Sequence, residues 1–232
     1  GEAGRGQLSG NLTWGQALGM DVRLQGQQLP VAVEPYATLE VAPDLTLRLI
    51  DDKLAVTGKV QVPKGKITVR ELPPSTVKVS DDTVIVGHQT EEGKPPMAMA
   101  MDIDVEVGRE KLSFSGFGLT ANLLGHVHIG DNLDTRGELS LADGRYRAYG
   151  QRLTIRRARL LFAGPIDQPY LDIEAIRKVD DVIAGIRLSG SAEQPTTKVF
   201  SEPAMSQEQA LSYLVLGRPL GNTGEDNNML AE

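Results

Sequence analysis

The sequence predicts an all-β protein: a long, largely antiparallel sheet folded over into a taco-like trough with a hydrophobic interior, and one short C-terminal helix. Apolar residues recur at every second position along most of the chain, which is the period of strands with one apolar face. Turn-forming residues separate these segments, and only one segment has the pattern of a helix. Parallel crossovers would need further helices, so neighbouring strands are expected to be antiparallel.

Residues 97–107 are the clearest strand. Six apolar side chains occupy the odd-numbered positions, so these positions should face the interior. Burial stabilises each by about 1.5 to 3 kcal/mol, so this face must meet something apolar. Similar alternation elsewhere predicts that the apolar lining of the trough is made of Leu54, Val56, Val60, Val62, Met97, Met99, Met101, Ile103, Val105, Val107, Leu139, Leu141, Leu171, Ile173, Ile186 and Leu188.

A dozen or so short strands are expected, including residues 77–79 and 84–86. Asp143-Gly144 is the best hairpin turn, since it lies between the alternating segments 138–141 and 145–149. Other turns are predicted at Asp51-Asp52, Pro73-Pro74, Asp81-Asp82, Pro95-Pro96, Asp131-Asn132 and Gly164-Pro165.

The single helix is expected to begin after Ser206 and to end at Gly217. Ser206 is a good N-cap, Gln209 follows three residues later as in a capping box, and glycine commonly ends helices. The expected organisation is a β-groove domain over residues 1–200, a helix packed at the groove end over residues 201–218, and a polar tail over residues 219–232. The groove-end contacts should come from Leu211, Leu214 and Val215.

Two arrangements could cover the apolar faces: a closed sandwich of two sheets, or one curled sheet that leaves a slot for an apolar ligand. Alternation alone favours the sandwich. The low aromatic content of 4% favours the trough, because a large closed core usually relies on aromatic bulk. Methionines are adaptable and suit variable apolar ligands, although a methionine row is also common in ordinary cores.

Composition and motifs disfavour several classes of function. A net charge of −7 and few aromatic residues argue against nucleic acid binding, and no apolar run reaches the length of a membrane helix. The absence of cysteine excludes thiolate chemistry and disulfides, and fits either a periplasmic or a cysteine-poor cytosolic protein. No catalytic or phosphate-binding motif is present, so we expect neither an enzyme nor a cofactor.

Two clusters of polar residues are candidate sites. Asp102 and Asp104 share the outer face of a strand, where solvation is a better explanation than acid–base catalysis. His126 and His128 share a strand face and would need a third ligand, but the remaining histidine, His88, lies in an expected loop. No metal site is therefore predicted.

Arginine is concentrated between residues 145 and 159, in a stretch that contains no acidic residue. This basic patch could meet anionic headgroups or an acidic partner, and a solvated hairpin exterior explains it equally well. Its members are Arg145, Arg147, Arg152, Arg156, Arg157 and Arg159.

Residues 138–218 resemble the C-terminal region of the TamB family. The resemblance rests on Gly137 to Leu141, Asp143 to Gln151, Leu153 and Ile155, continues through Leu160, Phe162, Gly164, Pro169, Leu171, Ile173, Ala175, Arg177, Gly185, Gly190 and Pro195, and ends at Ser201, Pro203, Met205, Ser206, Leu211 to Leu214, Gly217 and Arg218. About eighty residues carry it, and residues 1–135 agree only in their glycine-punctuated amphipathic strands.

The resemblance implies a periplasmic protein, anchored in the inner membrane by a segment absent here, whose folded sheet encloses a hydrophobic groove. It implies phospholipid acyl chains as cargo, the outer-membrane barrel TamA as a partner, and a role in outer-membrane protein assembly. The family's sequence continues beyond Glu232, so we read the chain as an excised domain in which the TamA contact is incomplete. Three functions stay open at this point: a lipid-conducting groove, a chaperone that pairs strands of outer-membrane proteins or autotransporters with its own edge, and a plain structural sandwich.

Overall fold

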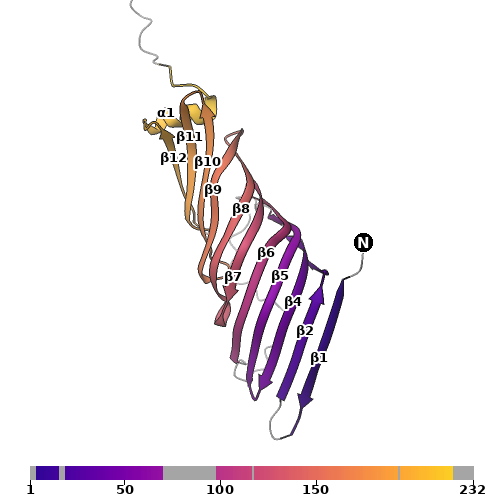
Figure 1. The fold of residues 1–232 in the computed structure, drawn as a ribbon. Helices are drawn as coiled ribbons and strands as arrows, with labels where there is room; N and C mark the ends of the chain where they lie inside the picture. Colours follow the sequence, from indigo (N-terminus) through magenta and orange to yellow (C-terminus); the bar gives the residue numbers. More distant parts are fainter. Residues whose placement is uncertain (1–3, 16–18, 70–97, 117, 193, 222–232) are drawn as a thin grey trace, which may run out of the picture.

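The protein forms one sheet of 12 strands, in a computed structural model that describes residues 4–15, 19–69, 98–116, 118–192 and 194–221. Strands follow one another across the sheet in chain order, except that β3 pairs with β4 beside the main path (Figure 1). The strands are β1 (Arg5–Thr13), β2 (Gly19–Gln27), β3 (Leu29–Val33), β4 (Ala37–Ile50), β5 (Lys53–Val69), β6 (Ala98–Gly116), β7 (Leu119–Ile129), β8 (Asp134–Ala148), β9 (Gln151–Pro165), β10 (Tyr170–Val179), β11 (Val182–Ser191) and β12 (Thr196–Glu202).

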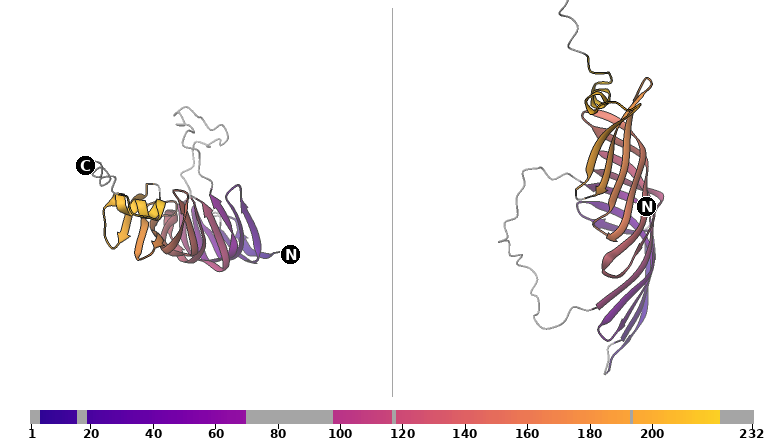
Figure 2. Two further views of the ribbon diagram at one scale, coloured as in Figure 1. Left: turned by 90° about the horizontal axis from the view of Figure 1, so that it is seen from above. Right: turned by 90° about the vertical axis from the view of Figure 1, so that its left-hand side faces the viewer.

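The sheet is open, because β1 and β12 lie at its two ends and are not paired with each other. Figure 2 shows that the sheet is twisted and curved. All neighbouring strands are antiparallel except β5 and β6, which are parallel. The predicted curled, largely antiparallel sheet is therefore confirmed, and the described residues form this single open sheet and no closed sandwich.

The hairpin predicted at Asp143-Gly144 is wrong. Both residues lie within β8, where they form a bulge opposite Ala121 of β7. The chain instead turns at Tyr149 and Gly150, whose φ angles of 51° and 73° suit a tight two-residue hairpin between β8 and β9. A bulge and a turn use the same residue types, since Asp143 also has a positive φ of 53°.

The strands are longer than predicted, because a bulge interrupts the alternation of apolar residues without ending the strand. The predicted strand 97–107 is part of the 19-residue strand β6 over residues 98–116, which has an irregularity between Val107 and Leu112. Gly108 allows this irregularity with a φ of 82°, and a Cβ there would lie 1.9 Å from the carbonyl oxygen of Leu123. Residues 77–79 and 84–86, and the turns at Pro73-Pro74, Asp81-Asp82 and Pro95-Pro96, lie outside the described residues.

The apolar side chains of one face form two clusters. The first, here the central cluster, is built on strands β5 to β10 from the buried residues Val62, Leu112, Leu119, Ala121, Leu123, Leu141, Ala158 and Ile173. The second, the C-terminal cluster, joins strands β9 to β11 to the helix through Leu153, Ala175, Ala184, Ile186 and Leu214. Tyr146, Ile155 and Leu188 pack against both clusters, so the apolar face is continuous.

The helix α1 (Gln207–Leu216) confirms the predicted capping. The Ser206 hydroxyl accepts a hydrogen bond from the backbone N–H of Gln209 at 3.3 Å. Gly217 ends the helix in the left-handed conformation with a φ of 69°. Helix α1 contacts β10, β11 and β12, and it lies at the C-terminal end of the sheet (Figures 1 and 2).

Candidate functional site

The candidate site is the apolar face of the curled sheet. Ile103 is 8% exposed, and Val105 and Val107 are half-buried and pack against the central cluster. The predicted inward direction of the odd-numbered positions in β6 is thus confirmed for this part of the strand. After the irregularity the even-numbered side chains face the apolar side instead, since Leu112 belongs to the central cluster and Phe114 packs against it.

The other residues of the predicted lining differ in burial. Val62, Leu139, Leu141, Ile173 and Ile186 are buried, whereas Met99 is 50% exposed. Met97 lies outside the described residues. Half-buried positions are Leu54, Val56, Val60, Met101, Leu171 and Leu188. A single sheet thus places a band of aliphatic side chains on one face, and many of them keep part of their surface exposed.

The C-terminal end of this face is covered by α1. Leu214 is 1% exposed and packs in the C-terminal cluster, and Val215 is half-buried. Leu211, which we expected to pack beside them, is 38% exposed. Arg177 reaches from β10 and donates hydrogen bonds to the carbonyl oxygens of Leu214 at 2.9 Å and Val215 at 3.3 Å. A cation at a helix C-terminus is favourable, so this contact holds the end of α1 on the sheet.

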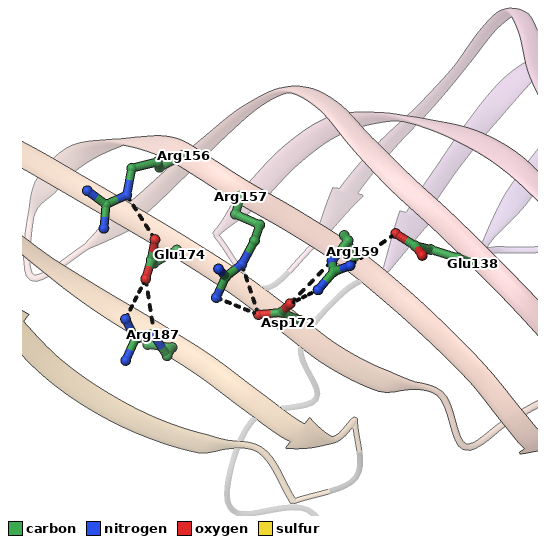
Figure 3. Close-up of polar contacts among 7 residues, drawn as sticks. All are labelled: Glu138, Arg156, Arg157, Arg159, Asp172, Glu174 and Arg187. Atoms are coloured by element: carbon green, nitrogen blue, oxygen red, sulfur yellow. Dashed lines mark hydrogen bonds and ion pairs between the residues drawn. The ribbon is translucent and has the colours of Figure 1, made fainter.

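The opposite face of the same strands carries a network of ion pairs, shown in Figure 3. Its centre is Glu174 on β10, which is 3% exposed. Arg156 Nε donates to one carboxylate oxygen at 2.8 Å and Arg187 Nη2 to the other at 2.6 Å. Both guanidinium groups also lie over the ring of Phe200, 5.4 and 4.9 Å from its centre. Arg156 continues the network to Glu202.

These contacts determine the charge state of the two central carboxyls. Burial alone would raise the pKa of Glu174, but the hydrogen bonds from Arg156 and Arg187 outweigh it and hold that pKa below 4.5. The pKa of Asp172 is held below 3.8, chiefly by its hydrogen bond from Arg159 and also by the charge of Arg157. Both carboxylates are therefore ionised at neutral pH and act as structural anions between strands.

The network divides the predicted basic patch. Arg156, Arg157 and Arg159 are paired with acids on neighbouring strands, so this half of the patch is neutralised in the fold. Sequence reasoning missed these partners because they lie on other strands. Alternation along β10 places Asp172 and Glu174 on the polar face, and that was the available signal. Arg145, Arg147 and Arg152 are exposed and form no such pairs.

The two histidines weighed as metal ligands pair instead with the two aspartates weighed as catalytic groups. His128 Nε2 lies 2.6 Å from Asp102 Oδ1, and His126 Nε2 lies 3.7 Å from Asp104 Oδ1. All four are on the polar face of β6 and β7. Within the described residues no group of three or more potential ligands is arranged to hold a metal ion. His88 lies outside those residues.

The fold and the site define a class: an open, curled β-sheet with one continuous apolar face, capped at one end by a helix. Over residues 1–232 the chain matches the family model described as the TamB C-terminal domain. It is also 32% identical, over 240 aligned residues, to the translocation and assembly module subunit TamB of Haemophilus influenzae (strain ATCC 51907 / DSM 11121 / KW20 / Rd). That alignment covers 94% of this chain and 18% of the relative. The chain belongs to the TamB family. In the described part, no helix has the length and apolar character needed to cross a membrane.

Proposed function

We propose that the apolar face is a groove that conducts phospholipids between the inner and outer membranes. The observation that carries this proposal is the set of half-buried aliphatic side chains that lie beside the buried residues of the central cluster. Val60, Val105 and Val107 pack against the central cluster yet keep exposed surface, and α1 makes its main contacts with β10, β11 and β12. A face of this kind offers apolar contacts without the barrier of a closed core.

The physical need for such a face follows from the cost of exposing acyl chains to water. A sixteen-carbon chain in water is unfavourable by on the order of 12 kcal/mol, at about 0.8 kcal/mol per CH₂ group. An aliphatic band that runs across many strands replaces water along the path. Tails then slide along Val, Ile, Leu and Met side chains without any chemical step or cofactor.

The cellular setting is part of the same proposal. The relative's name, a translocation and assembly module subunit, supports a role in the assembly of outer-membrane proteins. We place the domain in the periplasm, in a protein anchored in the inner membrane by a segment outside this chain, with the barrel TamA as partner. This chain spans 18% of the length of that relative, so the roles of the whole protein enter only as part of this proposal.

A charge placed on the groove tests the proposal. Val105→Arg puts a cation on the half-buried floor, and Gln61→Arg puts the same charge on the exposed opposite face of the neighbouring strand. Val105→Arg should reduce transfer of a fluorescent phospholipid between donor and acceptor vesicles about tenfold, a barrier of about 1.4 kcal/mol. Gln61→Arg should transfer lipid like the unmodified chain.

Urea unfolding of both variants separates a conduit from a core. Water can reach a charge in an open groove, so Val105→Arg should unfold close to the Gln61→Arg midpoint. If Val105→Arg instead loses several kcal/mol of stability in parallel with its transfer activity, the face is a packed core and the conduit is wrong.

The open edges of the sheet favour a second function, in which the domain binds unfinished strands of outer-membrane proteins or autotransporters by β-augmentation. In the described part of the chain, β12 pairs only with β11, so its other edge presents free backbone groups. Proline at Thr197 or Lys198 should abolish strand capture if this edge is used, and should leave phospholipid transfer unchanged.

A further inference from the structure

Three arginines of the polar face stand apart from the ion-pair network. Arg145 and Arg147 lie two residues apart on β8, and Arg147 is directly opposite Arg152 of β9. Cross-strand partners share a face, so all three guanidinium groups project from the same side of the sheet. None of them makes a side-chain hydrogen bond or ion pair in the described structure.

This arrangement is unfavourable without an anion. Like charges directly opposite each other destabilise a strand pair, and Arg147 and Arg152 form such a pair. Four residues further along β9, Arg156 forms ion pairs with Glu174 and Glu202. Arg157 and Arg159 both form ion pairs with Asp172. The chain carries a net charge of −7, so acids are available, yet among the described residues none forms an ion pair with Arg145, Arg147 or Arg152.

The same arginines line a hollow of about 430 Å³ beside the turn between β6 and β7. The size is within the range of small-ligand sites, about 300 to 1,000 Å³. Hydroxyl groups come from Ser115 and Thr120. Leu119 and Tyr146 complete the lining, and both belong to the apolar face: Leu119 is part of the central cluster, and Tyr146 packs against it.

We infer that Arg145, Arg147 and Arg152, on the polar face near the ends of β8 and β9, bind the phosphodiester headgroup of a lipid whose acyl chains pass over Leu119 and Tyr146, around this edge of the sheet, onto the apolar face. Guanidinium groups suit phosphate oxygens because they donate paired hydrogen bonds in a fixed plane. The hollow joins these donors to Leu119 and Tyr146, so it offers both parts of an amphipathic ligand. This inference rests on the proposed lipid function and adds to it an entry or exit point with a preference for phosphate-bearing lipids.

The test uses the chain with the short lipid dihexanoylphosphatidylglycerol at concentrations where it is monomeric. Changing all three arginines to glutamine should weaken binding at least about tenfold in calorimetry. The control changes Lys59, Lys66 and Lys198 to glutamine, which removes the same charge from exposed positions that do not line this hollow. The control should bind within about twofold of the unmodified chain, as expected if net charge contributes little beyond steering. Equal weakening in the two triple variants would overturn the inference.

Two further ligands separate this inference from the proposed function. Dihexanoylglycerol has the same tails without phosphate, and it should bind the unmodified chain and the arginine variant equally. Glycerol phosphate should bind much more weakly than the lipid; if it binds as tightly, the hollow takes free phosphate esters and the lipid headgroup is wrong. If neither acyl ligand binds, the proposed function fails.

Stability gives an independent readout. Arg147→Gln removes the like-charge contact with Arg152, so without lipid it should raise the unfolding temperature while it lowers lipid affinity. A purely structural arginine would lose stability on the same substitution, and that result would contradict a ligand-binding role.

Discussion

The apolar face of the sheet is covered to different extents at the C-terminal end and in the centre. At the C-terminal end, α1 covers the apolar face, and Leu214 and Ala184 are 1% and 0% exposed. In the centre, Val60 and Val105 line the same face and stay half-buried. The polar face differs along the sheet as well: Glu174 is buried among arginines, whereas the pair between Arg23 and Asp44, on β2 and β4 towards the N-terminal end, is more than half exposed.

This difference separates structure from function within one sheet. The C-terminal end has an apolar cover and a polar network of its own, so its contacts are complete within the chain. The centre has strand pairing but an unfinished apolar contact, which is the property needed by a face that exchanges ligands. Variants matched between the two regions test whether this division is real.

The largest effect is expected at the helix contact. Leu214→Ala leaves a cavity in the C-terminal cluster and should destabilise the docking of α1 by about 2 to 5 kcal/mol. Leu211→Ala, one turn earlier and 38% exposed, should change stability by about 0.5 kcal/mol or less. Hydrogen exchange across residues 207–216 and tryptic cleavage at Arg218 measure the release of the helix.

The same pair tests whether α1 limits access to the groove. Released from the sheet, the helix would uncover Ile186 and its neighbours in the C-terminal cluster. Leu214→Ala should then bind an environment-sensitive fluorescent lipid more strongly than Leu211→Ala does. Equal binding, with the helix shown to be detached by cleavage at Arg218, would make α1 a packing element and not a gate.

A smaller effect is expected on the polar face. Glu174→Gln removes the charge that Arg156 and Arg187 share and leaves both guanidinium groups near Phe200 without their anion. Loss of these charged hydrogen bonds should destabilise the C-terminal end by about 1 to 3 kcal/mol. Asp44→Asn breaks the exposed pair with Arg23 and should cost at most about 1 kcal/mol. Urea unfolding measures the loss of stability in each variant. Equal losses in Glu174→Gln and Asp44→Asn would contradict the proposed division of the sheet.

The fold was predictable from the sequence at the level of faces, and less so at the level of strand ends. Period-2 alternation identified β6, and the Ser206 and Gly217 caps identified α1. Asp143-Gly144 misled because an aspartate with positive φ serves a bulge as well as a turn. A bulge also reverses the parity of the apolar positions, so one long strand reads as two short ones. Only pairing with the neighbouring strand, which is a tertiary property, distinguishes the two cases.

The candidate site was predictable in outline for the same reason. Alternation placed Val62, Ile103 and Ile173 on the apolar face, and all three are buried there. Alternation could not assign ion-pair partners across strands, so it did not distinguish the six arginines of the basic patch from one another. Register divides that patch: it sets Arg159 beside its partner Asp172, and Arg147 beside Arg152.

Acid should weaken the C-terminal end before the centre. The folded-state pKa values of Asp172 and Glu174 lie below the ordinary 3.8 and 4.5, so the stability they contribute is fully present above those values. It is lost as pH falls through the lowered folded-state pKa values. Between neutral pH and about pH 3, near the ordinary carboxyl range, the unmodified chain should therefore lose more stability than Glu174→Gln does. Parallel pH profiles from urea unfolding would show that Glu174 does not carry the effect.

The smallest effect, and one confined to the centre, is expected at the pair of His128 and Asp102. The hydrogen bond to Asp102 raises the pKa of His128 above 6.5, and both side chains are well exposed, so the contribution is small. Because the folded-state pKa is raised, this contribution is fully present below the ordinary value and is lost as pH rises through the raised pKa. The chain should thus be slightly more stable in this region at about pH 5 than at about pH 8.5, values that bracket a histidine titration. His128→Gln should reduce that difference, whereas His126→Gln, which removes a ring 3.7 Å from Asp104, should retain it. A proton NMR titration of His128 with a midpoint at or below 6.5 would contradict the pairing in solution.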